Sequence, residues 1–127
     1  MGKFGLIAAL AALALAVDVA SGHRVTFPTT VDDDWEYSTG AGQASIRGNL
    51  LSPRRACLGN RVVRMVAITN QVPEVFSVDR TSDNGFFGGR GKISSTQADD
   101  LRVKGPPKRL GRHRRCGGFN VVLFPPG

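Results

Sequence analysis

The cysteines and histidines are the residues of this chain most able to carry chemistry. There are two of each, Cys57, Cys116, His23 and His113. A nucleophilic cysteine needs a neighbouring base, and the two histidines are the only candidates for that base. His23 follows the N-terminal apolar segment, and His113 lies in a basic segment late in the chain. The sequence therefore offers little support for a catalytic cysteine.

A metal ion is the second role open to these side chains. His113 and Cys116 are three residues apart and could both bind one ion, but Cys57 would add only one further ligand. A zinc site normally needs three or four such ligands. A third role, a disulfide between Cys57 and Cys116, is favoured over the nucleophile and the metal ligand. We therefore predict no metal ion and no cofactor.

The acidic run 32–36, DDDWE, is a further candidate cation site, because hard cations bind several carboxylate oxygens. Its spacing is not that of a calcium loop, so a solvated acidic turn is favoured. The sequence also lacks a G-x-S-x-G elbow, an H-E-x-x-H motif and a phosphate loop. We therefore predict no catalytic residues and no enzyme, with a small hydrolase as a remote alternative.

The basic segment 102–115 is the one stretch whose composition points to a function. It holds seven cationic residues and no acid, which equals the net charge of +7 of the whole chain. Such clustering is typical of a site that attracts polyanions. The alternative is a solvated loop whose charge keeps the protein soluble. The candidate polyanion contacts are Arg102, Lys104, Lys108, Arg109, Arg112, Arg114 and Arg115.

The N-terminus has the order of a secretory signal peptide over residues 1–21. Lys3 is followed by an apolar run from Leu6 to Val17 and then by small residues, with cleavage expected after residue 16 or 21. The apolar run is shorter than the roughly 20 residues of a spanning helix. We expect a secreted, periplasmic or extracellular protein with no membrane span after cleavage. Export would also permit a disulfide.

The rest of the chain predicts an all-β fold, because short runs rich in Val, Ile, Phe and Thr alternate with Gly and Pro. We expect residues 22–43 to lead into a single β-sandwich of about seven strands that spans residues 44–127 and includes the basic loop. The expected strands are Ala44–Leu51, Arg61–Thr69, Val75–Thr81, Phe86–Gly89, Leu101–Lys104 and Phe119–Phe124, with a further one near Trp35–Ser38.

Alternation and turn chemistry predict which side chains face the core. Val63 and Met65 alternate with Arg64, which must reach solvent, so they are expected inside, together with at least one of Phe86 and Phe87. Asp83, Asn84 and Gly85 tolerate the positive φ angles of a tight hairpin turn. We therefore predict a hairpin between the strands on either side of this turn.

The order of these signals resembles a family of exported bacterial domains with the prealbumin-like (carboxypeptidase-regulatory-like) β-sandwich fold, whose members are mostly uncharacterised. The resemblance covers about residues 27–122, and Asp99 and Asn120 depart from the family pattern. It implies an Ig-like sandwich and export, and it implies no catalytic residues. The matching segments are Phe27-Pro28-Thr29-Thr30, Gly48 with Ser52, Cys57–Met65, Thr81–Phe87, Leu101 with Val103, and Cys116.

Together these features predict an exported, disulfide-closed, non-catalytic binding or interaction module. The alternative is a protein that binds a polyanion or the cell envelope through the basic loop 102–115. The partner is expected to be an anionic envelope polymer or another protein. A specific nucleic acid is not expected, because the loop has no aromatic residue for base stacking.

Overall fold

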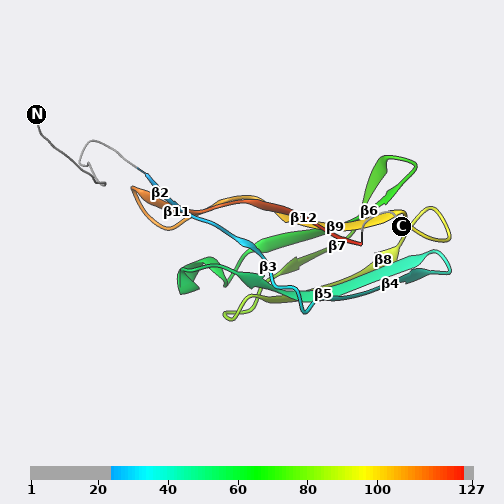
Figure 1. The fold of residues 1–127 in the computed structure, drawn as a ribbon, viewed down its shortest axis with the longest axis horizontal. Helices are drawn as coiled ribbons and strands as arrows, with labels where there is room; N and C mark the ends of the chain where they lie inside the picture. The colour runs from blue at the N-terminus through cyan, green and yellow to red at the C-terminus, as the bar shows by residue number, and fades with distance from the viewer. Residues whose placement is uncertain (1–23, 125–127) are drawn as a thin grey trace, which may run out of the picture.

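The computed structural model describes residues 24–124, and the fold is an all-β sandwich, as the sequence predicts. Two four-stranded sheets lie face to face, and a small three-stranded sheet extends from one end (Figure 1). The strands are, in chain order, β2 Val25–Phe27, β3 Thr30–Val31, β4 Glu36–Gly40, β5 Gln43–Leu51, β6 Val62–Thr69, β7 Val72–Arg80, β8 Phe86–Lys92, β9 Asp100–Gly105, β10 Lys108–Arg109, β11 Arg114–Cys116 and β12 Phe119–Phe124.

The first large sheet has the strand order β12-β9-β6-β7, and all its pairs are antiparallel. Strands β6 and β7 form a hairpin in which Thr69 pairs with Val72. The two loop residues, Asn70 and Gln71, have φ angles of 51° and 67°. Positive φ at both positions gives the turn a twist that matches paired strands.

The second large sheet is built around β5. Strand β8 pairs with β5 from Gln43 to Asn49, while β4 and β3 follow one another along the opposite edge. Residues 25–43, expected to lead into the sandwich, therefore contribute strands of their own. In β5 the buried residues Ala44, Ile46, Gly48 and Leu50 alternate with more exposed ones, so one face of this sheet points to the core.

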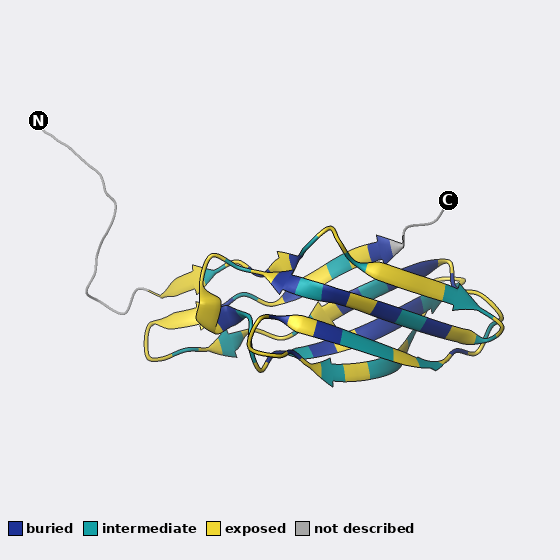
Figure 2. Cartoon of the chain, turned by 90° about the horizontal axis from the view of Figure 1, so that it is seen from below, coloured by how far each residue is buried: buried dark blue, intermediate teal, exposed yellow. Residues whose placement is uncertain are grey.

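Buried and exposed positions alternate along the strands of the sandwich (Figure 2). The core between the two large sheets contains the residues that alternation predicted. Val63, Met65 and Phe87 are each 0% exposed, whereas Phe86 is 49% exposed. Arg64 reaches solvent, as expected. The prediction of the core face of β6 is confirmed.

The turn at Asp83 and Asn84 is followed by Gly85, whose φ is +90°. A hydrogen bond from the Gly85 backbone N to the Ser82 carbonyl oxygen, 2.9 Å long, closes it. The predicted hairpin is wrong, because β8 pairs with β5 and β7 pairs with β6. The turn instead carries the chain from one sheet of the sandwich to the other.

The strand expected at Leu101–Lys104 is confirmed as β9, but the rest of the predicted basic loop is not a plain loop. Residues 105–115 contain the end of β9, all of β10 and the start of β11. Strand β11 pairs antiparallel with β10 and parallel with β2, which gives a three-stranded sheet. This sheet extends past the sandwich at one end, where β2 and β11 lie side by side (Figure 1). We call it the tip.

The predicted signal peptide, residues 1–21, lies outside the described residues. Within residues 24–124 no helix is long and apolar enough to cross a membrane.

Candidate anion-binding site

The cationic side chains of the tip lie on β10, β11 and the turn that joins them. Arg109, Arg112, Arg114 and Arg115 are all exposed. Backbone hydrogen bonds from Leu110 N and Gly111 N to the Arg114 carbonyl oxygen, 2.9 and 3.2 Å long, close this turn. Figure 2 shows this end of the molecule as mainly exposed strand. The result is a cluster of four exposed arginines at the end of the sandwich, in which Arg114 and Arg115, consecutive on β11, point to opposite faces.

The strand register places two of these cations opposite one another. Arg109 pairs with Arg115 across β10 and β11, and Arg115 pairs with Thr26 of β2. Arg115 Nε donates a hydrogen bond of 3.4 Å to Thr26 Oγ1. Like charges that face each other across a strand pair are destabilising. An anion bound between the two guanidinium groups would remove this repulsion.

No carboxylate offsets these charges locally. The segments 25–27 and 108–116, which form the strands and the turn of the tip, contain neither Asp nor Glu. Neither ion pair of the described residues, Arg47–Glu36 or Arg102–Asp100, involves the tip. The tip therefore has an excess of positive charge that is available to an external anion.

Three of the seven predicted contacts lie elsewhere or are engaged by the protein itself. Arg102 and Lys104 lie on β9 within the first large sheet, and Arg102 Nη2 donates a hydrogen bond of 2.8 Å to Asp100 Oδ2. Lys108 Nζ donates hydrogen bonds to the carbonyl oxygens of Gly59 and Ala56, at 2.8 and 3.3 Å. Lys108 thus ties β10 to the segment around Cys57. The predicted group of seven is therefore divided by the fold.

Two arginines far away in the sequence complete the cationic tip. Arg24 is exposed and directly precedes β2, whose first residue, Val25, donates a backbone hydrogen bond of 2.7 Å to the His113 carbonyl oxygen. The Arg54 guanidinium lies 5.4 Å from the ring centroid of Phe27 in β2, within the range of a cation–π contact. Sequence reasoning missed both, because the parallel pairing of β2 with β11 has no local sequence signal.

A disulfide fixes the tip to the sandwich. Cys57 and Cys116 are joined by an S–S bond of 2.08 Å, and both residues are 0% exposed. Cys57 ends the short 3-10 helix η1 (Arg55–Cys57), and Cys116 ends β11. Because both sulfur atoms are in this bond, neither cysteine is a nucleophile or a metal ligand.

The guanidinium of Arg61 holds the base of the tip from inside. Arg61 is 2% exposed and donates hydrogen bonds to four oxygens from separate segments of the chain. Burial lowers the pKa of this guanidinium from its ordinary value. The acceptors are Thr29 Oγ1 (3.1 Å) and the carbonyl oxygens of Cys57 (2.8 Å), Pro106 (3.1 Å) and Gly117 (2.8 Å).

Comparison with protein-family models, with curated proteins and with solved structures finds no match to this chain. The resemblance to the prealbumin-like family therefore stays a prediction from the order of the sequence motifs.

The other candidate chemistry has no assembled site in the described part of the chain. Residues 24–124 contain no group of three or more His, Cys, Asp or Glu side chains that could hold a metal ion. Asp33 and Asp34 lie in an exposed turn before β4. His113 is exposed on the tip, and His23 lies outside the described residues. The tip is thus the strongest candidate among the sites that the sequence singled out.

Proposed function

We propose that the protein is an exported, non-catalytic binding module whose tip engages an anionic polymer. One observation supports this most directly: Arg109 and Arg115 face each other across two exposed strands, in a segment that contains no carboxylate. A cluster of exposed cations attracts phosphate or carboxylate groups without a shaped pocket. The ligand class is therefore a flexible polyanion, such as an anionic polymer of the cell envelope.

The arrangement of the cations favours this function over a purely solubilising charge. Charge that serves solubility can be spread over the whole surface and mixed in sign. Here the cations are gathered on a small sheet that is held by the disulfide and by Arg61. A rigid base keeps the guanidinium groups together, so less conformational entropy is lost when a polymer binds.

The test is a titration with long-chain polyphosphate at several salt concentrations. If about four anionic groups are contacted, affinity falls by roughly 50-fold between about 50 and 200 mM salt. The variant Arg109→Gln/Arg112→Gln/Arg115→Gln should bind at least tenfold more weakly at low salt. The slope of log affinity against log salt should decrease by about 2, because roughly three counterion-releasing contacts are lost.

The matched control removes three cations outside the tip. Arg64, Lys92 and Lys104 are exposed residues of the large sheets, so Arg64→Gln/Lys92→Gln/Lys104→Gln changes the net charge equally. This control should keep most of the affinity. Equal losses in the two triple variants would show that binding follows net charge alone, and the assignment to the tip would then be wrong.

We also propose export as the biological context. The order of charged, apolar and small residues in 1–21 supports it, and the disulfide-bonded β domain is compatible with an extracellular location. Intact mass measured on protein from the medium or periplasm tests this proposal. Export predicts the loss of residues 1–16 or 1–21, whereas a full-length mass with two free thiols would contradict it.

A further inference from the structure

A groove crosses the outer face of the second large sheet, away from the core. It has a volume of about 540 Å³ and lies over β4, β5 and β8. The register explains its lining, because Glu36, Arg47 and Gly88 form one cross-strand row and Ser38, Ser45 and Arg90 form the next. Side chains of alternate residues on these three strands therefore project from one surface.

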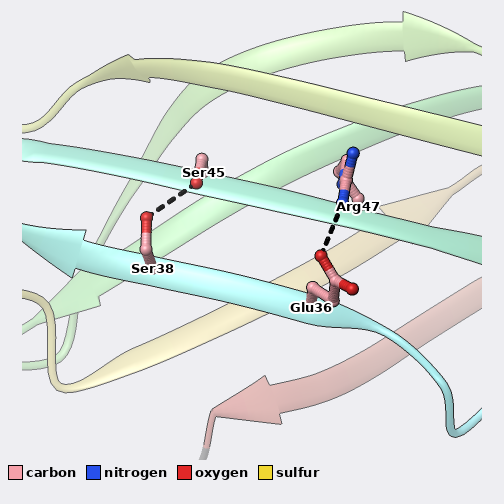
Figure 3. A network of polar contacts seen from close by, with 4 residues as sticks. All are labelled: Glu36, Ser38, Ser45 and Arg47. Atoms are coloured by element: carbon pink, nitrogen blue, oxygen red, sulfur yellow. Dashed lines mark hydrogen bonds and ion pairs between the residues drawn. The ribbon is translucent and has the colours of Figure 1, made fainter.

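One side of the groove is held in place by two polar contacts between β4 and β5 (Figure 3). Arg47 Nη2 donates a hydrogen bond of 2.6 Å to Glu36 Oε1, and the oxygens of Ser38 and Ser45 are 2.8 Å apart. The hydrogen bond to Glu36, and then its negative charge, raise the pKa of Arg47. Hydroxyl, guanidinium and carboxylate groups thus stand in two adjacent rows.

The other side of the groove is formed by β8, where Gly88 allows the Arg47 side chain to pack closely against the strand. Gly88 lies between Phe86 and Arg90, and a Cβ atom at this position would stand 3.2 Å from Arg47 Cγ. Phe86 is 49% exposed. The side chain of Arg90 is exposed and has no hydrogen-bond or ion-pair partner among the described residues. An apolar ring and a cation therefore flank the aliphatic part of Arg47, which packs over Gly88.

These groups match a carboxylated sugar better than they match a polyphosphate. Sugar hydroxyls donate and accept hydrogen bonds, so they suit both Glu36 and the serine hydroxyls. Glu36 and Asp79 balance the charges of Arg47 and Arg90 in the lining of the groove, so the groove has no excess positive charge to attract closely spaced phosphates. The apolar face of a sugar ring can cover Phe86, and a guanidinium such as that of Arg90 binds a carboxylate with paired hydrogen bonds.

We propose that this groove is a second binding site, distinct from the tip, and that it takes an oligosaccharide containing a uronic acid. Arg90 binds the sugar carboxylate, and Phe86 packs against a ring face. Ser38, Ser45, Glu36 and Arg47 exchange hydrogen bonds with the ring hydroxyls.

The test is calorimetric titration of the oxidised protein with tetragalacturonate and with its neutral methyl ester. A salt concentration of about 0.5 M limits unspecific attraction, because charges more than about 5 Å apart are then largely screened. Arg90→Ala should weaken tetragalacturonate binding about tenfold or more, the effect of losing a charged hydrogen bond. It should change binding of the weaker methyl ester less than threefold.

Each variant has a matched control on the same face or the neighbouring strand. Lys92→Ala removes the same charge from β8 at a position outside the groove and should leave affinity unchanged. Phe86→Ala should weaken both sugars at least fivefold, whereas Val78→Ala, an exposed apolar residue of β7, should weaken neither.

Three results would overturn the proposal: no binding of tetragalacturonate at millimolar concentration, equal affinity of Arg90→Ala and the unaltered protein, or loss of binding only in the triple variant of the tip. The last would assign the sugar acid to the tip and leave the polyanion proposal standing. If the protein binds tetragalacturonate but not polyphosphate, only the proposed function of the tip would be wrong.

Discussion

Arg61 Nη1 donates a hydrogen bond of 2.8 Å to the carbonyl oxygen of Cys57, whose sulfur is bonded to Cys116. Arg61 Nη2 donates another of 2.8 Å to Gly117, the residue after Cys116. The two sides of the disulfide are therefore joined twice, once by the S–S bond and once through a single cation. Both links lie at the base of the tip and position its arginines.

Replacement of Arg61 should strongly destabilise the fold. In Arg61→Met the four oxygens that accept hydrogen bonds from the guanidinium lose their partner in a buried site. We expect the free energy of unfolding to fall by about 3 kcal/mol or more, because each buried oxygen left without a donor costs about 1–3 kcal/mol. In Arg61→Lys the free energy of unfolding should fall by less, because an ammonium group still reaches some of these oxygens.

Urea unfolding measures this effect, with Arg64→Met as the control. Arg64 is exposed on the same strand, so its replacement should change the unfolding free energy by no more than about 0.5 kcal/mol. A similar stability for the two variants would show that the Arg61 hydrogen bonds contribute little.

Removal of the disulfide should lower stability by a comparable amount. Cys57 and Cys116 are 59 residues apart, and closing a loop of this length stabilises the folded state by about 4 kcal/mol in the chain-entropy model. In a domain of this size, that corresponds to a decrease in Tm of roughly 15 °C or more. Thermal unfolding of Cys57→Ala/Cys116→Ala, beside the oxidised protein, measures it. An unchanged Tm would contradict this role of the disulfide.

The sandwich and its core could be predicted from sequence because the signals for them are local. Alternation along β6 identified Val63 and Met65 as buried, and Arg64 showed which face meets solvent. Clusters of Gly, Asp and Asn marked where strands end. Comparison of the roles open to each cysteine also led to the pair Cys57 and Cys116, which the structure joins.

Pairing between distant segments could not be predicted in the same way. The turn before β8 has hairpin composition, yet β8 pairs with β5, because the turn alone does not specify which edge a strand joins. The hairpin of β6 and β7 turns at Asn70-Gln71, which lacks the glycine usually expected there. Such features depend on tertiary packing rather than on residue type.

In the candidate site, too, local features could be predicted from the sequence and features set by distant pairing could not. Arg109, Arg112, Arg114 and Arg115 were predicted from charge clustering and do lie together on the tip. Charge alone could not show that Lys108 is engaged by backbone carbonyls. The groove over Gly88 was not predicted, because its residues come from three strands and are joined only by their register.

The final prediction concerns the close approach of β8 and β7 beneath the groove. A Cβ atom at Gly91 would stand 1.9 Å from the Phe76 backbone oxygen, and one at Gly89 would stand 2.2 Å from Ser77 Oγ. A serine side chain can rotate away, but a backbone oxygen moves only if the strand moves. Gly91→Ala should therefore be the more harmful change and separate the two sheets locally.

We expect Gly91→Ala to lower the free energy of unfolding by about 3 kcal/mol, the upper range for overpacking a core. Gly111→Ala is the matched control, because a Cβ atom there has no neighbour within 4 Å. It should change stability by no more than about 0.5 kcal/mol. Urea unfolding measures the free energy of unfolding of both variants. If Gly91→Ala is as stable as Gly111→Ala, the two sheets can separate at this edge without cost, and the glycines of β8 do not set their spacing.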